Sequence, residues 1–359
     1  MSTEKAEHSP QSDIDEVQIP SPEPEKPTVS DYKIVCAKLG LVMIVYFICR
    51  IVGALISGAI AELAGYIGHT AVQAIVMSIT VIMVYIIPML FTAFIFRSFS
   101  YFNIFGKVFK ELYKKNKQFA SSLGTFPAVY GLGYGIALIT LLVSFLISRF
   151  TGGETFISDL LQPTTIEPAS GIGGAIGMVF LLVVIAPVFE EIWVRGIMYD
   201  ALKPFGNGIA IIISSILFGL MHGSLHMLFY TTVVGLALGY IRYATNSLLA
   251  VTILHAIFNA VAAGMLFMMA LTDITFGESR LINTAYNIYL LAVLVLIVVG
   301  IIAFVIRIPK IRKYKIENTW TDITAGKKMA LFFASIPVII MIVFALNELT
   351  GHRVIGLLF

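Results

Sequence analysis

The chain has 359 residues, of which 58% are hydrophobic and only 13% are charged, and its formal net charge at pH 7 is +3. A soluble domain carries roughly 25% charged residues, so this composition excludes an ordinary soluble protein and predicts an all-α polytopic membrane protein. Long apolar runs separated by short charged loops favour helices over a barrel, whose strands would be short and alternating. We expect membrane lipid around the chain and no nucleic-acid partner.

The first 32 residues differ in kind from the rest of the chain. Residues 1–32 are rich in proline, serine and acidic side chains. Such a segment cannot bury enough apolar surface to offset its chain entropy, so it is predicted to be a disordered, acidic, cytoplasmic tail. The tail is either simply solvated or an arm that docks a protein partner. Residues 33–359 are then the membrane domain.

Nine apolar segments follow, and we interpret them as about eight to nine transmembrane helices: 39–65, 71–96, 121–148, 172–198, 208–224, 226–243, 248–272, 284–306 and 329–347. Most are near or above the roughly 20 residues that cross the hydrocarbon. The fifth and sixth are short and are separated by only a few residues. They could be two tilted spans or a partly re-entrant pair.

Lysine and arginine are concentrated in alternate loops, namely those after the second, fourth, sixth and eighth apolar segments. The positive-inside rule then places the N-terminus in the cytoplasm and the C-terminus outside. The loop 98–119 mixes lysine with phenylalanine and is either an amphipathic surface helix or an ordinary basic loop. The compact loops, the acidic tail and the lack of a targeting signal suggest a bacterial plasma membrane.

Three short polar clusters, 190–195, 218–222 and 255–259, lie inside apolar segments. Ionisable residues at membrane depth are costly, so they are candidates for function by default. Counting residues from the nearest loops at the helical rise puts the three clusters at overlapping depths. We therefore predict one buried polar site in the four central helices.

The first cluster contains two adjacent carboxylates that cannot share a helix face, because consecutive residues project about 100° apart. Glu191 and Arg195 are four residues apart and do share a face, so we predict that they form a structural ion pair. Glu190 then points elsewhere. A carboxylate in such a position suits a general base that takes a proton from water.

The other two clusters supply imidazoles and an amide. Asn259 follows His255 by one turn, so its amide could hold an imidazole or a water, or donate to an oxyanion. A lone histidine in a membrane helix often makes a hydrogen bond between helices, but His222 and His255 together with Glu190 favour a functional site, because three ionisable groups at membrane depth are costly. His226 could pair with His222 around a metal, but an interfacial histidine is favoured because it follows a turn. Arg50 is a further intramembrane cation, which either snorkels or lines the cavity.

The three clusters, taken in order, resemble the CPBP intramembrane proteases, the family of CAAX-type and bacteriocin-processing enzymes also called Abi. Its motifs are Glu-Glu-x-x-x-Arg, Phe-x-x-x-His and His-x-x-x-Asn, which match 190–195, 218–222 and 255–259. Each motif alone is weak, but three in order inside apolar segments are specific. The resemblance covers about residues 170–265.

The resemblance implies an intramembrane endopeptidase that cleaves a membrane-associated or hydrophobic peptide or protein. It implies catalytic roles for Glu190, His222, His255 and Asn259. Glu190 with His222 would activate water, and His255 with Asn259 would stabilise the oxyanion. Substrates of this family range from CAAX proteins to bacteriocin leaders and signalling peptides, in processing or in bacteriocin immunity.

Two alternatives stay open at this point. Glu190, His222 and His255 could together bind Zn²⁺, as in a metalloprotease, or work without a metal. We favour the second, because the carboxylates would be needed both as ligand and as base. The chain could also be a non-catalytic membrane regulator or bacteriocin-immunity partner that uses the same pocket for binding.

Overall fold

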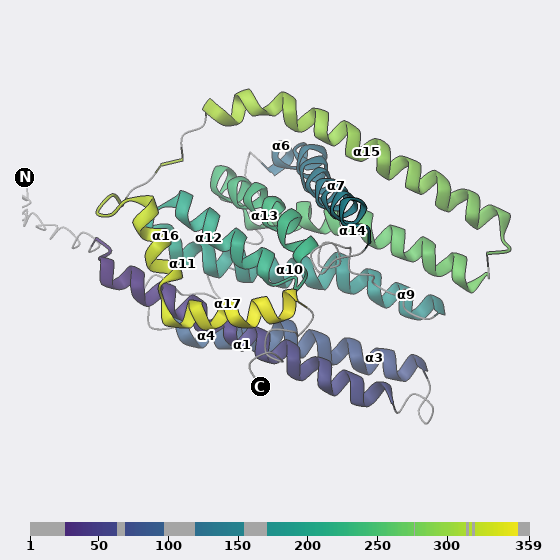
Figure 1. Ribbon diagram of the computed structural model, residues 1–359, viewed down its shortest axis with the longest axis horizontal. Helices are drawn as coiled ribbons and strands as arrows, with labels where there is room; N and C mark the ends of the chain where they lie inside the picture. The colour runs from purple at the N-terminus through teal and green to yellow at the C-terminus, as the bar shows by residue number, and fades with distance from the viewer. Residues whose placement is uncertain are drawn as a thin grey trace, which may run out of the picture.

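The computed structural model describes residues 26–62, 69–96, 119–153, 171–275, 277–313, 316–317 and 320–350. In these residues every regular element is a helix, which confirms the predicted all-α class (Figure 1). Residues 1–25 of the predicted tail, the basic loop 98–118 and the acidic loop 154–170 lie outside the described part. The first helix begins at Val29, three residues before the predicted end of the tail.

The elements follow one another in this order: α1 (Val29–Ala61), α3 (His69–Thr80), η1 (Val81–Ile86), α4 (Ile87–Phe96), α6 (Phe119–Leu123), α7 (Phe126–Thr151), α9 (Gly171–Phe180), η2 (Leu181–Ile185), α10 (Ala186–Glu191), η3 (Ile192–Met198), α11 (Tyr199–Leu202), η4 (Lys203–Phe205), α12 (Asn207–Leu220), α13 (Leu225–Thr245), α14 (Leu248–Ile274), α15 (Arg280–Lys313), α16 (Ala325–Phe333) and α17 (Ile336–Leu349). The segments η1, η2 and η3 are π-helical, with one extra residue per turn, whereas η4 is a short 3-10 turn.

Seven helical runs in the described residues are long and apolar enough to cross a membrane, and the bent pair of α16 and α17 makes an eighth. This count confirms a polytopic membrane protein. The fifth predicted segment is shorter than expected, because α12 has only 14 residues, about 21 Å at the helical rise. Gly223 ends this stretch with a φ of 67°, and the chain turns back into α13. The cytoplasmic N-terminus and the bacterial membrane stay predictions.

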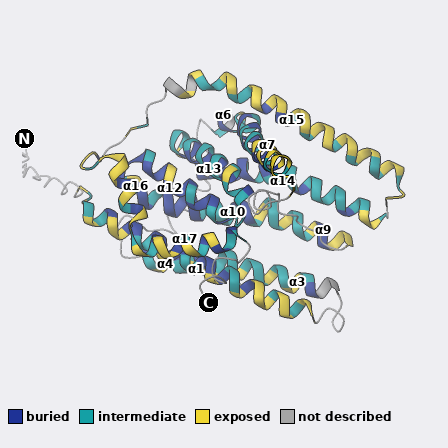
Figure 2. Ribbon diagram, viewed as in Figure 1, coloured by how far each residue is buried: buried dark blue, intermediate teal, exposed yellow. Residues whose placement is uncertain are grey.

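The helices that carry the polar clusters are covered on both sides (Figure 1). On one side lie α1, α3, α4 and α17, and on the other lie α7, α13 and α15. Buried residues gather along α10 and α12, whereas exposed residues dominate α15 (Figure 2). The exposed residues of α15 are largely leucine, isoleucine and valine, as expected of a surface whose solvent is lipid.

Small residues set the closest helix contacts. A Cβ on Gly131 of α7 would collide with the backbone of Gly300 in α15. A Cβ on Gly40 of α1 would lie 2.6 Å from the backbone of Pro337 and Val338 in α17. Helices in lipid associate through such close backbone approach, because burial of apolar surface gives them little driving force. Gly40 thereby seats the C-terminal helix against α1.

Candidate active site

A cavity of about 290 Å³ lies in the middle of the helices. Its walls include Glu190 from α10, His222 from the turn after α12, and His255 and Asn259 from α14. The structure thus brings all four predicted catalytic residues to one space, although they come from three separate parts of the chain. Their individual contacts decide what each could do.

Glu190 is mostly buried, with 13% of its side chain exposed. Its Oε1 accepts a hydrogen bond from the hydroxyl of Tyr85 at 3.3 Å, and its Oε2 lies 3.8 Å from Nε2 of His255. The second distance is too long for a direct hydrogen bond and is within the range of an ion pair. Tyr85 belongs to the π-helical segment η1, and no sequence pattern had indicated it.

Glu191 and Arg195 pair within one helical run, with Oε1 and Nη1 2.8 Å apart and both side chains fully buried. A second nitrogen of the guanidinium, Nη2, donates to the carbonyl of Gly235 at 3.2 Å. The guanidinium also lies 4.4 Å from the centre of the Phe218 ring, a cation–π contact. The arginine therefore ties the first cluster to α12 and α13.

The same carboxylate has a second partner that the sequence did not reveal. Nδ1 of His255 lies 2.8 Å from Oε1 of Glu191. An ionised carboxylate only accepts hydrogen bonds, so Nδ1 carries the proton and Nε2 is turned toward Glu190. Glu191 thus orients His255 in addition to pairing with Arg195. An outer carboxylate that fixes the tautomer of a functional histidine is a frequent arrangement.

His222 is oriented in a similar way by the backbone. Its Nδ1 lies 2.8 Å from the carbonyl oxygen of Phe218, one turn earlier, and donates to it, which leaves Nε2 as an acceptor. The Phe218 ring contacts both imidazoles edge-on, with centroids 4.9 Å from His222 and 5.6 Å from His255. Phe218, which the sequence alone suggests is ordinary packing, therefore orders both histidines and Arg195.

Asn259 donates from Nδ2 to the carbonyl of Leu182 at 2.9 Å. The π-helical register explains why this carbonyl needs a donor. The N–H of Ala186, its ordinary α-helical partner, bonds to Leu181 instead. The next donor in the π register would be residue 187, which is proline and has no N–H. One amide hydrogen of Asn259 thus satisfies the backbone, and the second is left for the cavity.

Two residues of α1 also line the cavity, outside the predicted core of residues 170–265. The hydroxyl of Tyr46 donates to the carbonyl of Met221 at 2.8 Å, and Nη1 of Arg50 donates to the same oxygen at 2.7 Å. Met221 follows α12, where helical carbonyls lack intrahelical donors. Of the two outcomes considered for Arg50, the structure has the one in which it lines the cavity.

His226 is not one of the residues that line the cavity. It is 7% exposed, and its Nδ1 lies 3.1 Å from the hydroxyl of Thr140 on α7. His226 therefore packs between α13 and α7, and its position at the membrane interface stays a prediction.

Across the described residues, no three His, Cys, Asp or Glu side chains are grouped as metal ligands. In this arrangement Glu190, His222 and His255, the residues of the zinc alternative, are not grouped closely enough to form a three-ligand metal site. Nδ1 of each histidine is held by another group, and Nε2 of His255 faces Glu190 at 3.8 Å. We derive no chemical step through a metal.

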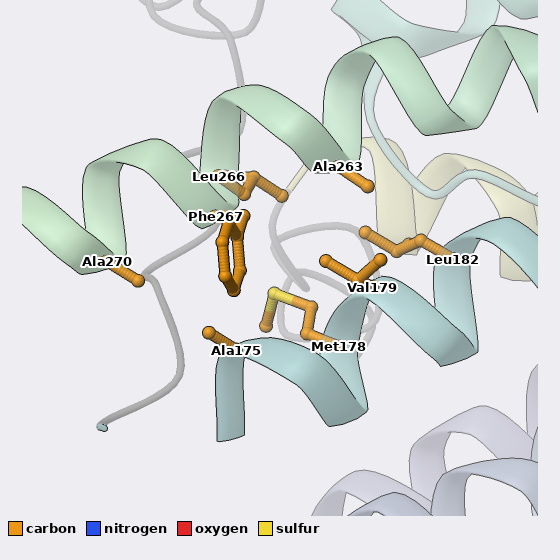
Figure 3. Close-up of a pocket in the computed structure, with 8 residues that line it drawn as sticks. All are labelled: Ala175, Met178, Val179, Leu182, Ala263, Leu266, Phe267 and Ala270. Carbon is orange, nitrogen blue, oxygen red and sulfur yellow. The ribbon is translucent and has the colours of Figure 1, made fainter. Parts of the chain in front are cut away.

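A second, much smaller void lies beside the site between α9 and α14 (Figure 3). Apolar side chains from the two helices, among them Met178, Val179 and Phe267, point toward one another and close it (Figure 3). With a volume of about 10 Å³ and no polar lining group, it holds no chemistry. Leu182 and Leu266 line both this void and the larger cavity, so apolar side chains form the wall between the two.

Comparison with known proteins identifies one family. Residues 172–261 match the model described as type II CAAX prenyl endopeptidase Rce1-like, and this match covers about a quarter of the chain. The matched stretch contains all three polar clusters and confirms the resemblance that they predict. No curated protein and no solved structure matches the chain.

Proposed function

We propose that this chain, a member of the CAAX protease family, is an intramembrane endopeptidase that hydrolyses a peptide bond in a membrane-associated or hydrophobic peptide or protein. The family supports CAAX-type protease activity in general terms. The residues and the substrate class are our own assignment. The observation that carries it is the shared cavity, whose walls hold Glu190, His222, His255 and Asn259 together.

Water activation is assigned to Glu190 and His222. Glu190 takes a proton from a water molecule while Nε2 of His222 accepts the second hydrogen of that water. The water oxygen attacks the carbonyl carbon of the scissile bond. The proton on Glu190 then passes to the amide nitrogen as the C–N bond breaks, so that Glu190 returns to its starting state.

Charge balance supports the role of His255. With neutral histidines, Glu190, Glu191 and Arg195 carry one net negative charge, and their side chains are buried or mostly buried. One additional proton shared between Glu190 and His255, 3.8 Å apart, makes the cluster neutral. When that proton is on His255, its Nε2–H can donate to the developing oxyanion. The second amide hydrogen of Asn259 is available for the same task.

The walls of the cavity support an apolar substrate. Apart from the polar groups, they are made of aromatic and aliphatic side chains: Tyr134, Met227, Tyr230, Val234, Phe258 and Leu266. Such a lining binds apolar side chains of a peptide and excludes bulk water, which strengthens the electrostatic interactions of the catalytic groups. The proposal therefore covers hydrophobic or membrane-anchored peptides of the CAAX type.

The experiment that tests the proposal compares peptide termini in membranes of cells that express the native chain or Glu190→Gln at matched levels. Glu62→Gln is the matched control, because Glu62 is an exposed carboxylate at the end of α1. We expect new termini with the native chain and with Glu62→Gln, and none with Glu190→Gln. Those termini would also identify the substrate.

A different result would overturn the proposal. Identical termini in all three strains, together with a deletion phenotype that Glu190→Gln rescues, would indicate a non-catalytic regulator that binds a partner in the same cavity.

A further inference from the structure

Arg50 contributes the one Lys or Arg side chain among the described residues that line the cavity. It lies on α1, outside the stretch that matches the family. A cation in an apolar span costs free energy, so such a residue is normally paired with an anion and is a candidate for function. Its partner is Glu348, near the end of α17, with Nη2 and Oε2 3.3 Å apart.

Two ion pairs, Glu191–Arg195 and Arg50–Glu348, differ in length and in exposure. The first has the properties of a fixed structural pair, and the second those of a pair that can exchange partners. Glu191 and Arg195 are 2.8 Å apart and 0% exposed. Arg50 and Glu348 are 3.3 Å apart, and the arginine side chain is 28% exposed. A charge-assisted hydrogen bond of full strength is about 2.7–2.9 Å long. The looser, accessible pair can change partners at small cost.

The position of Glu348 on its helix points the same way. It lies in the last turn of α17, where the negative end of the helix dipole disfavours a carboxylate. Arg50 compensates for that cost in the empty site. A carboxylate from another molecule would not carry this penalty, so it can compete with Glu348 for the guanidinium.

The guanidinium itself is held in place without Glu348. Nη1 donates to the carbonyl of Met221 at 2.7 Å. Gly223 lies directly beside it, and a Cβ there would be 2.7 Å from Nη2 of Arg50. Arg50 is thus fixed against the turn that carries His222, with donors left over, because a guanidinium has five. The planar guanidinium of Arg50 can therefore donate two parallel hydrogen bonds to a carboxylate.

We propose that Arg50 binds a carboxylate of the substrate and thereby sets where the chain is cut, and that Glu348 occupies the guanidinium while the cavity is empty. This inference rests on the proposed protease function. The carboxylate is either the C-terminal one of the peptide or that of an Asp or Glu side chain. Glu190, the one acidic residue among the described lining residues, repels it and so orients the peptide with its carboxylate toward Arg50.

The test uses the full-length protein in detergent and a quenched fluorogenic decapeptide library with randomised apolar positions. The library is made with a free C-terminal carboxylate or with a C-terminal amide, and each form contains one Glu or one Gln near its C-terminus. Cleavage is measured as kcat/KM for the native chain, Arg50→Gln, Arg50→Lys and Glu348→Gln. Glu190→Gln gives the background.

We expect loss of the carboxylate that binds Arg50 to lower kcat/KM of the native chain about tenfold, the strength of a charged hydrogen bond. If the C-terminal amide has this effect, the α-carboxylate is the ligand, whereas an effect of Glu to Gln assigns a side chain. Arg50→Gln should cleave all four forms with equal, low efficiency. Glu348→Gln should lower KM for the carboxylate form, because it removes the competing group.

Arg50→Lys keeps the positive charge and should retain part of the discrimination, which makes the test independent of whether Arg50→Gln folds. Equal cleavage of all four forms by the native chain would overturn the role of Arg50 and leave the protease function intact. Cleavage by the native chain no faster than by Glu190→Gln would instead contradict the proposed function itself.

Discussion

At the scale of single residues, the two neighbouring glutamates belong to different networks. Glu190 contacts Tyr85 and faces the cavity, whereas Glu191 is fully buried between Arg195 and His255. The angle of about 100° between consecutive helical side chains produces this separation. Glu191 is consequently both a counter-ion and the acceptor that sets the tautomer of His255, and these two roles can be separated by mutation.

We predict that Arg195→Ala lowers the free energy of unfolding by about 3–5 kcal/mol, because it leaves Glu191 as a buried charge without its cation. The level of folded protein in the membrane, measured by fluorescence-detected size exclusion, should fall. The double variant Glu191→Leu with Arg195→Met should restore that level, since apolar residues can replace a buried pair. Activity should stay low, because Nδ1 of His255 loses its acceptor.

The opposite result is easy to recognise. If Arg195→Ala accumulates normally but is inactive, the arginine acts in the chemistry and its role as a structural counter-ion is wrong.

At the scale of elements, the π-helical segments connect the backbone to the site. The extra residue in η2 shifts the hydrogen bond of Ala186 to Leu181, and Pro187 supplies no donor, so the carbonyl of Leu182 is left to Asn259. The segment η1 in turn carries Tyr85. Such π-helical turns are frequent at functional sites. Here the local irregularity of one helix sets the position of an amide on another.

The second prediction is that Asn259→Ala lowers the free energy of unfolding by about 1–3 kcal/mol, the cost of a buried carbonyl without a donor. Adding Pro187→Ala should recover part of this loss, because residue 187 then has an N–H that reaches Leu182 in the π register. Thermal unfolding of the two single variants and the double variant measures the coupling. Activity should not recover, because the amide that faces the cavity is still missing.

Asn283→Ala is the matched control for this cycle. Asn283 also donates to a backbone carbonyl, that of Gly277 at 2.6 Å, but this hydrogen bond is exposed, so water can replace it. Its effect on stability should be small. Strictly additive effects of Pro187→Ala and Asn259→Ala would refute the proposed link between the proline and the amide.

At the scale of the whole molecule, helices far outside the matched family stretch complete the cavity. Helix α1 supplies Tyr46 and Arg50 to the wall of the cavity, and α17 supplies Glu348, the ion-pair partner of Arg50. Helices α1 and α17 run parallel. Gly40 of α1 lies against Pro337 of α17, and Arg50 lies against Glu348, which is ten residues further along α1 and eleven further along α17. The close contact at Gly40 therefore sets the position of Glu348 relative to Arg50.

The third prediction concerns this contact. Gly40→Leu should lower the free energy of unfolding by about 1–3 kcal/mol, because the added side chain overpacks the contact with α17. The control is Gly58→Leu on the same helix, where an added Cβ meets nothing within 4 Å. Thermal unfolding in detergent compares the two. Equal stability of both variants would mean that α17 is not seated against α1 as described.

Much of this protein could be predicted from its sequence, because the relevant signals are local. Hydropathy along the chain predicts membrane helices, since each must satisfy its own backbone in lipid. The spacing of four between Glu191 and Arg195 predicts that they share a face, and they are 2.8 Å apart. The order of the three clusters predicts a resemblance to the CAAX protease family, which the match over residues 172–261 confirms.

The tertiary structure decided the contacts that depend on how one helix is rotated and placed against another. No spacing in the chain links Tyr85 to Glu190, Glu348 to Arg50 or His255 to Glu191, which are 105, 298 and 64 residues apart. A hydropathy pattern also does not predict the π-helical segments, which rotate every later side chain around the helix axis. The sequence by itself determined which segments are apolar enough to cross a membrane and that Glu191 and Arg195 share a helix face. Helix packing determined which residues of different helices meet, because those contacts depend on how each helix is rotated and placed.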